Sequence, residues 1–397
     1  MVVAAFLGMA TKYSEGLLAV KHRTVAEDGH SLGGPFYYIE LGMGKNFKWL
    51  AKIFAFFGVC VGLFGIGTFS QVNGISSAVH GFFDPNDAFT VKILPFLGEY
   101  SWSVVIASLI LSFCVAAVLI GGVKRIASVS QIIVPFMAVI YFVFAVILIC
   151  CNITKVPAAF ATIVTAAFSP KAITGGAVGS MLIAMQKGVA RGIFSNEAGL
   201  GSAPIAAAAA QTNSPVRQGL VSMTGTFIDT IIICTLTGLS IVLTGAWQVE
   251  GLEGVQVTTY AFQHGLPFPA QFSSFILMLC LVFFAFTTIL GWDYYSERCL
   301  EYLSGGNMKH VKIFRWIYIL AVFIGPYMTV SAVWTIADIF NGLMAIPNMI
   351  ALFALSGVIV KETRAFFQHA KEEARAEHRS FEEVCEENLN EEEAPAN

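Results

Sequence analysis

Residues 188–204 read Gly-Val-Ala-Arg-Gly-Ile-Phe-Ser-Asn-Glu-Ala-Gly-Leu-Gly-Ser-Ala-Pro, within an apolar stretch that extends from about 174 to 210. Four glycines, a proline and the ionisable residues Arg191 and Glu197 fall near its middle. Polar, helix-breaking backbone is tolerated at membrane depth only where protein buries it or where it lines a wet cavity. This stretch therefore predicts a functional interruption rather than an ordinary membrane span.

The interruption predicts a broken helix. We expect one half before Gly192 and a second half that begins near Ser202, which can cap it, with Pro204 in its first turn. The ends of such half-helices expose unpaired N–H and C=O groups, which bind anionic substrate groups and cations in secondary transporters.

The rest of the chain has the composition of a membrane protein. Of its 397 residues, 56% are apolar and 12% are charged, whereas about 25% are charged in soluble proteins. So little charge excludes a soluble enzyme, a nucleic-acid-binding protein and a secreted disulfide scaffold. We predict an all-α polytopic membrane protein that lies in a lipid bilayer.

A membrane span needs about 20 mostly apolar residues. On this criterion residues 1–360 form a transmembrane body of about nine helical elements. The first is partial, because polar residues follow about ten apolar ones. The elements are 1–20 (partial), 49–80, 101–121, 127–150, 174–210, 218–245, 269–292, 310–328 and 331–360.

Charge predicts the orientation. When successive segments alternate between the two sides, 18 of the 23 Lys and Arg fall on the side of segments 21–48 and 293–309. The positive-inside rule makes that side cytoplasmic. Residues 361–397 carry 5 basic and 11 acidic side chains and form an acidic tail on the same side. We expect a multi-pass protein of the cell (inner) membrane with a cytoplasmic C-terminus.

Residues 191–204 closely resemble the signature of the alanine or glycine:cation symporter family, the sodium:alanine symporters of bacteria and archaea. Residues 8–15, 33–39, 284–292 and 344–348 agree with the same family. The resemblance implies a leucine-transporter-type bundle of two inverted five-helix repeats. It also implies symport of alanine or glycine with Na⁺ by alternating access, and no cofactor besides that co-transported ion.

Against this family, Met1 aligns within the second core helix. An inverted-repeat transporter should have two interrupted helices at corresponding positions, and the sequence shows one. We therefore expect an N-terminally truncated bundle that lacks its first core helix. The alternative function is an incomplete gene product or membrane scaffold without transport of its own.

The resemblance also implies an ion site. Thr287 and Thr288 lie in an apolar run, and their hydroxyls suit Na⁺, a hard ion that prefers oxygen ligands. The alternative is that each hydroxyl bonds its own i−4 carbonyl. Trp292, one turn beyond Thr288, either walls the substrate cavity or belongs to the aromatic belt at the membrane interface. Asp293 stands where the resemblance implies a small polar residue.

Other polar side chains are candidates for substrate contact. The resemblance implies that Gln71 contacts the substrate, whereas interhelical amide bonding is the alternative for Gln71 and Asn73. Thr288 and Trp292 complete a substrate set with four residues of the broken helix, Gly192, Phe194, Ser195 and Asn196.

A last group has structural or gating roles. Arg191 and Glu197 form a structural pair or belong to the site, and Asp229 and Asp338 act as gates or as helix-packing groups. Lys12 and Glu15, three residues apart, are expected to pair at the cytoplasmic side. The sequence shows neither a transition-metal site nor a nucleophile–base motif, so an enzyme is the weakest interpretation.

Overall fold

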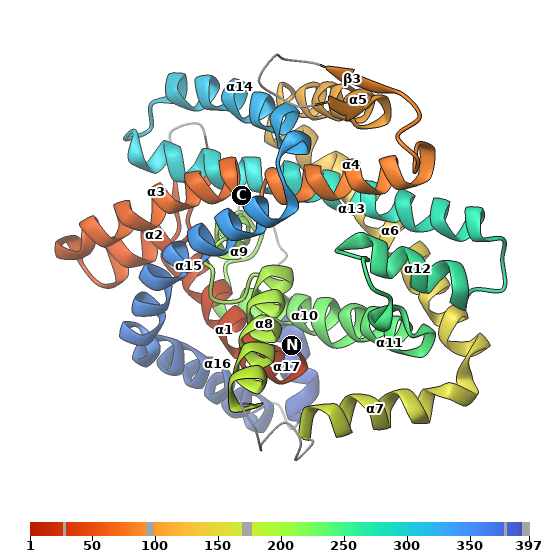
Figure 1. Ribbon diagram of the computed structural model, residues 1–397. Coiled ribbons are helices and arrows are strands. Elements are labelled where there is room, and N and C mark those ends of the chain that lie inside the picture. The colour runs from red at the N-terminus through yellow and green to blue at the C-terminus, as the bar shows by residue number, and fades with distance from the viewer. Residues whose placement is uncertain (27–28, 93–98, 169–176, 377–378, 391–397) are drawn as a thin grey trace.

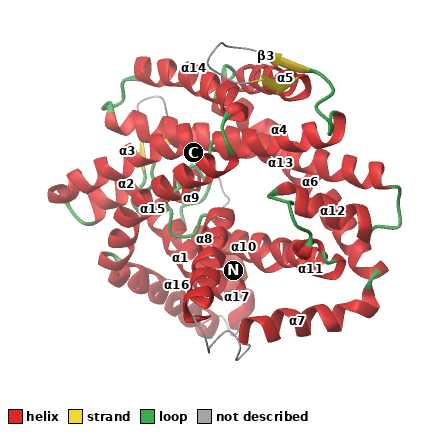
Figure 2. Ribbon diagram, viewed as in Figure 1, coloured by secondary structure: helices red, strands yellow, loops and turns green. Residues whose placement is uncertain are grey.

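The computed structural model describes residues 1–26, 29–92, 99–168, 177–376 and 379–390, and the structure of this part is almost entirely helical (Figure 2). Its longer helices are α1 (Val2–Lys21), α3 (Lys48–Phe64), α4 (Phe69–Phe83), α5 (Trp102–Leu119), α6 (Val123–Cys151), α7 (Val156–Phe168), α8 (Ala177–Asn196), α10 (Pro215–Thr226), α11 (Thr235–Thr244), α12 (Val255–Gly265), α13 (Ala270–Leu303), α14 (Met308–Ile324), α15 (Val330–Ala354), α16 (Ser356–Ala376) and α17 (Phe381–Asn390).

Short elements join these helices. Two are the single-turn helices α2 (Pro35–Tyr37) and α9 (Ala203–Ala207), and a π-helix, η5 (Phe227–Cys234), joins α10 to α11. Two small antiparallel hairpins pair β1 (Thr24–Val25) with β2 (Ser31–Leu32) and β3 (Thr90–Lys92) with β4 (Glu99–Ser101).

The prediction of a polytopic membrane protein is confirmed. Within the described residues, six helical stretches are long and apolar enough to cross a membrane. They are Lys45–Phe83, Trp102–Leu119, Val123–Cys151, Pro215–Thr244, Ala270–Leu303 and Ser331–Ala354. The other three expected elements correspond to α1, α8 with α9, and α14, which fall below that criterion.

The long stretch expected at 49–80 is itself interrupted, which the sequence analysis missed. Helix α3 ends at Phe64 and α4 begins at Phe69, and the two halves follow each other in nearly one line (Figure 1). The Thr68 hydroxyl donates to the carbonyl of Leu63 at 2.7 Å and so satisfies one backbone group at the interruption. The described chain therefore has interruptions at 65–68 and at 197–202.

Helix α13 is the central packing element. It contacts α3, α4, α6, α12 and α14 along its 34 residues. The span expected at 269–292 is too short, because α13 continues to Leu303 and keeps Asp293 and Glu297 buried. Apolar side chains of α3 and α14 pack against α13 and extend the core beyond the expected end of the span.

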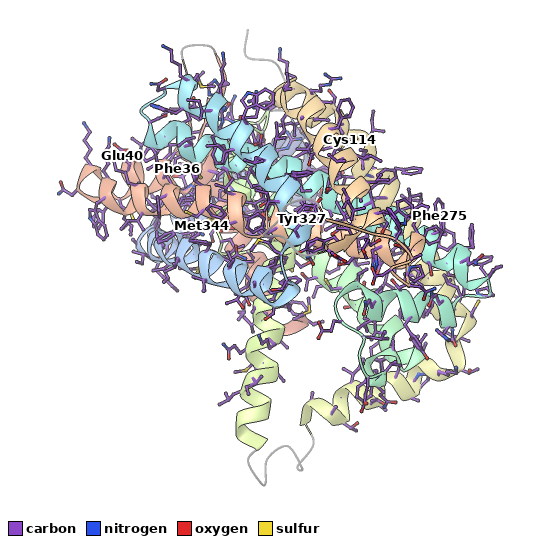
Figure 3. All side chains as sticks on the ribbon, turned by 45° about the horizontal axis from the view of Figure 1, so that its top comes forward. Phe36, Glu40, Cys114, Phe275, Tyr327 and Met344 are labelled. Carbon is purple, nitrogen blue, oxygen red and sulfur yellow. The ribbon has the colours of Figure 1, made fainter. Side chains whose placement is uncertain are left out.

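Polar contacts fix the end of the bundle where α2 meets α3. Glu40 lies there with Phe36 (Figure 3) and accepts hydrogen bonds from Lys48, at 2.8 Å, and from the Tyr302 hydroxyl. Partial burial opposes ionisation, but these two bonds hold the pKa of Glu40 below its ordinary value. The short π-helical segment Tyr38–Gly42, which contains Glu40, is thereby bonded to the end of α13.

The tail is helical over its described part. Helix α16 spans residue 360 and contacts α1, since Glu362 accepts from Lys21 at 2.8 Å and the hydroxyls of Thr363 and Tyr13 lie 2.7 Å apart. Helix α17 packs on α16 through Val384. The beginning of the tail is therefore attached to the transmembrane body.

Close packing of α3 on α13 generates a testable prediction. A Cβ added at Gly62 would lie 1.8 Å from Oγ and 2.9 Å from Cβ of Ser296. We expect Gly62→Ala to destabilise the protein by about 1–3 kcal/mol, because the helices must move apart. Its melting temperature in detergent should fall below that of the parent.

The matched control is Gly342→Ala in α15, where an added Cβ meets nothing within 4 Å. This change should be neutral or mildly stabilising, since alanine favours helix over glycine by up to about 1 kcal/mol. Equal melting temperatures for the two variants would contradict the close approach of α3 to α13.

Candidate functional site

The interruption between α8 and α9 is the centre of the candidate site. The broken helix is confirmed, but its position differs from the expectation, because α8 passes through Gly192 and ends at Asn196. Gly199 and Gly201 have φ angles of 86° and 83°, which glycine adopts at little cost. Glu197 has a φ of 58°, a left-handed conformation that costs about 1–3 kcal/mol and is concentrated at functional sites.

The five backbone N–H groups of residues 197–201, which follow α8, all have partners. Those of 197 and 200 donate to the carbonyls of Ile193 and Glu197, and that of 198 donates to the Asn196 side chain. Those of 199 and 201 donate to Glu15. None of the five donates to the carbonyls of residues 194–196. The end of α8 thus presents helix C-terminal carbonyls, whose partial negative charge favours a cation.

Glu15 is the residue that holds the interruption together, and the sequence analysis did not assign it to the site. Its Oε1 accepts from the backbone N–H groups of Gly199 and Gly201, both at 3.1 Å, and from Asn348 Nδ2 at 2.7 Å. Asn348 Nδ2 also lies 3.0 Å from the carbonyl oxygen of Gly199, to which it donates. Glu15 and Lys12 are both buried, and the hydrogen bonds of Glu15 Oε1 go to these distant groups, which the expected local pair did not include.

A signal for Glu15 was present in the sequence. It is an acidic residue in the apolar helix that also contains Leu17 and Leu18, and an ionisable residue in such a helix is a functional candidate by default. The spacing to Lys12 suggested a local pair, whereas the actual partners lie 184 and 333 positions away.

Glu197 accepts hydrogen bonds from Ser202 and Trp292 and does not pair with Arg191. The Ser202 hydroxyl donates to Glu197 Oε2 at 2.6 Å, so it does not cap α9 as expected. Trp292 Nε1 donates to Glu197 Oε1 at 3.0 Å. Pro204 does occupy the first turn of α9, as predicted.

Arg191 pairs with Asp338 of α15 instead of Glu197. Its Nη2 lies 2.5 Å from both carboxylate oxygens of Asp338. The guanidinium also stands over the ring of Trp334, 4.3 Å from the centroid, and 5.3 Å from that of Phe194. Both charged side chains are about one third exposed, 30% for Arg191 and 38% for Asp338, so this link between α8 and α15 lies at the edge of the protein.

The polar groups at the end of α8 also meet the π-helix η5. The Ser195 hydroxyl lies 2.9 and 2.8 Å from the two carboxylate oxygens of Asp229, and Asn196 Nδ2 donates to the Thr230 hydroxyl at 2.9 Å. π-Helical turns are rare and occur frequently at functional sites. The structure therefore brings Ser195, Asn196 and Asp229 together.

Trp292 lies between the two interruptions. It is 1% exposed, so its alternative assignment to an interface belt is wrong. On one side Trp292 contacts Glu197. On the other side it packs against Gly67, where an added Cβ would lie 2.7 Å from the Cβ of Trp292. Gly67 also accepts from the Tyr318 hydroxyl at 3.1 Å.

The two threonines have the local bonds that the alternative interpretation describes. The Thr287 hydroxyl contacts the carbonyls of Phe283 and Phe284 at 3.1 and 2.9 Å, and that of Thr288 donates to Phe284 at 3.0 Å. A donating hydroxyl keeps its oxygen lone pairs, so both side chains remain available as ligands.

The remaining candidates are less connected to the interruption. Asn73 donates to the carbonyl of Met328 at 3.0 Å, which is the interhelical amide bond of the alternative. Gln71 is partly exposed in the first turn of α4, just after the interruption at 65–68. A Cβ added at Gly192 would face Met1, whose Cα would be 3.6 Å away.

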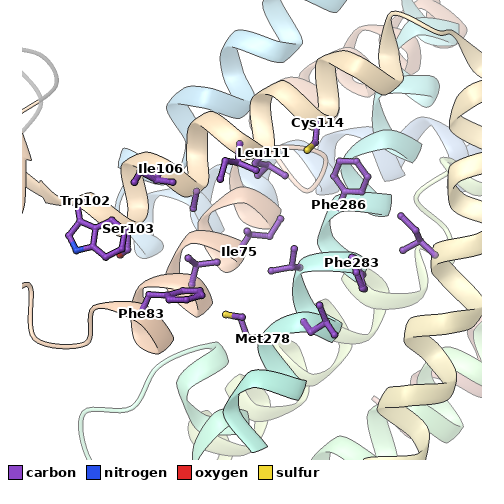
Figure 4. A pocket seen from close by; sticks show the side chains of 16 residues that line it. Ile75, Phe83, Trp102, Ser103, Ile106, Leu111, Cys114, Met278, Phe283 and Phe286 are labelled. Carbon is purple, nitrogen blue, oxygen red and sulfur yellow. The ribbon is translucent and has the colours of Figure 1, made fainter. Parts of the chain in front are cut away.

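Two other features have the shape or composition of a site, an apolar cavity and a cluster of titratable side chains. A cavity of about 500 Å³ lies between α4, α5, α6 and α13, but its lining is almost wholly apolar (Figure 4) and does not suit a zwitterion. His80, Asp84 and Asp87 place ligand atoms within 4.8 Å of one another. The pair of His80 with Asp87, at 3.0 Å, and the bond from Ser101 to Asp84, at 2.6 Å, account for this cluster.

The role of Glu15 predicts a difference between two substitutions. Glu15→Ala leaves two buried N–H groups without an acceptor, and each such group costs about 1–3 kcal/mol. Glu15→Gln keeps an acceptor oxygen for the same bonds. We expect a markedly lower melting temperature for the alanine variant than for the glutamine variant, and equal values would argue against Glu15 as the acceptor.

Sequence comparisons identify relatives of this chain. The sequence model of the sodium:alanine symporter family matches residues 1–380. An uncharacterized transporter of Haemophilus influenzae is 52% identical over 372 residues, which are 94% of this chain and 76% of that protein. The sodium/alanine symporter AgcS of Methanococcus maripaludis is 44% identical over 94% of this chain and 78% of its own length.

A more distant relative has another substrate in its name. The probable sodium/glutamine symporter GlnT of Bacillus subtilis is 35% identical over 94% of this chain and 72% of its own length. With the family model and these relatives covering nearly all of its residues, the chain belongs to the sodium:alanine symporter family, a family of multi-pass membrane transporters and not of enzymes.

Proposed function

We propose that this chain carries a small neutral amino acid, alanine or glycine, across the cell (inner) membrane together with Na⁺. The observation that carries the proposal is the interruption at 197–202, where the carbonyls at the end of α8 receive none of the N–H groups of residues 197–201 and lie beside Ser195, Asp229 and Glu197. Cation-binding helix ends of this kind are the coordination groups of secondary transporters. The name of AgcS supports alanine as the substrate.

The proposed substrate site lies around Trp292. The C-terminal end of α8, with Phe194, Ser195 and Asn196, offers oxygen atoms to an ammonium group, and Gly192 lies one turn earlier on the same helix. Gln71 and Thr288 supply neutral hydrogen-bonding groups, which recognise a zwitterion at a lower desolvation cost than charges do.

The proposed Na⁺ ligands are the hydroxyl oxygens of Thr287 and Thr288. They belong to α13, the same helix as Trp292, so the ion and the amino acid are bound by one rigid element. Such sharing couples the two ligands, because binding of either fixes the helix that the other requires.

We further propose a leucine-transporter-type inverted-repeat architecture with alternating access, in which one bundle rocks against the other. Arg191 and Asp338 form its gate, since this ion pair links α8 to α15 at a partly exposed position. The acidic tail and the excess of basic residues on its side support a cytoplasmic C-terminus.

Uptake by proteoliposomes tests the transport proposal. Labelled alanine should accumulate only with an inward Na⁺ gradient, and unlabelled glycine should compete. Equal accumulation with K⁺ replacing Na⁺ would remove the coupling. If the chain were a scaffold without transport, alanine with Na⁺ would also leave its melting temperature unchanged, because only a bound ligand stabilises by mass action.

A charge exchange tests the gate. We expect Arg191→Gln and Asp338→Asn each to slow Na⁺-driven uptake severalfold, because the contact between α8 and α15 is lost. The double variant with Arg191→Asp and Asp338→Arg should recover part of the rate. A double variant no faster than the slower single variant would show that the pair does not act as one unit.

A further inference from the structure

Asp293 is a buried carboxyl group without a hydrogen-bonding partner. It follows Trp292 on α13 and is 0% exposed. Neither of its two oxygens receives a hydrogen bond from the described residues. An ionised carboxylate in such a position is among the most costly groups that a protein interior can contain.

Neighbouring cations do not compensate it directly. Glu297, one turn later and also buried, accepts from Arg315 Nε at 2.7 Å and from Arg315 Nη2 at 2.9 Å. Arg298 pairs with Glu301 at 2.6 Å. The two arginines that act electrostatically on Asp293 are therefore each bonded to another acid, while Glu297 adds a like charge beside it.

Two hydroxyls on α13 and α14 are also engaged, whereas the buried Arg298 Nε has no hydrogen-bond partner among the described residues. On α14 the buried Tyr318 hydroxyl lies 2.7 Å from the carbonyl of Ile289 and 3.1 Å from that of Gly67. On α13 the Ser296 hydroxyl donates to the carbonyl of Gly58. The basic groups of α3 and α6, two further helices packed against α13, are exposed and outside this cluster, namely Lys48, Lys52, Lys124 and Arg125.

We propose that Asp293 is a proton-binding site. Its carboxyl group holds a proton in this conformation, and it releases that proton to water when movement of α13 against α14 opens the cluster. The step breaks only the O–H bond and leaves an aspartate and a hydrated proton. The transporter would then bind a proton besides Na⁺, at a position separate from the threonine pair.

A proton fits this position better than Na⁺ does. A sodium ion prefers several oxygen ligands, and the hydroxyls of Ser296 on α13 and Tyr318 on α14 already donate to carbonyls. A proton needs only the carboxyl oxygen itself. Neutralisation also leaves Arg315 and Glu297 as a complete pair, so the cluster contains no uncompensated charge.

Infrared difference spectroscopy of the purified full chain, titrated with base, tests the proposal without any measurement of transport. A C=O stretching band of a protonated carboxyl should persist at neutral pH in the parent and weaken in Asp293→Asn. The matched control Glu253→Gln, at an exposed acid, should keep the band. Absence of any such band in the parent at neutral pH overturns the proposal, even if the variant does not fold.

Stability gives a second readout. The unfolded chain has an ionised aspartate at neutral pH and so binds fewer protons than the folded one. The folded parent should therefore lose stability relative to Asp293→Asn as the pH rises, by up to about tenfold in the unfolding equilibrium constant per pH unit. Parallel pH profiles overturn the proposal, as does a neutral-pH band that Na⁺ removes, which would assign the position to sodium.

Discussion

The hydrogen bonds from Gly199 and Gly201 to Glu15 are the interaction on which the rest of the site depends. A segment without helical hydrogen bonds is stable inside an apolar body only if its backbone groups find other partners. One carboxylate oxygen of α1 receives two of these N–H groups, and Asn348 of α15 binds both that oxygen and the carbonyl of Gly199. Three segments that are distant in sequence are thereby held together.

The two interruptions face each other across one side chain. Trp292 donates to Glu197 at the first interruption and packs against Gly67 at the second. Because Glu197 is held in a left-handed conformation, the position of its carboxylate depends on these contacts and not on local backbone preference. A ligand that displaces Trp292 would therefore act on both broken helices at once, which is the mechanical requirement for a rocking movement.

Local sequence patterns predicted the parts of this structure that depend on local physics. Apolar length located the six candidate spans, and the glycines of 188–204 located the interruption, because both signals lie within a few turns of helix. The partners of Arg191 and Glu15 could not be found in this way, because each lies more than a hundred positions away in the sequence. Arg191 pairs with Asp338, and Glu15 accepts from Asn348. Spacing along one helix favoured the nearer partners, Glu197 and Lys12.

The failure to divide 49–80 has a similar cause. Gly65 and Gly67 resemble ordinary packing glycines in a membrane helix. What distinguishes Gly67 is the close approach of Trp292 and of the Gly62 backbone, which the sequence does not indicate. An apolar run can thus contain a break that composition does not indicate. Ser195 and Asn196 lie on the glycine-rich stretch and were found from it, whereas their contacts with Asp229 and Thr230 of η5 were not predicted.

The polar contacts of the site differ in how firmly they are held. Arg191 and Asp338 are about one third exposed and form a single ion pair. Glu15 is buried, and breaking its contacts would leave several backbone groups unsatisfied at about 1–3 kcal/mol each. The contacts of Glu15 therefore hold the interruption to α1 more firmly than the Arg191–Asp338 pair holds α8 to α15.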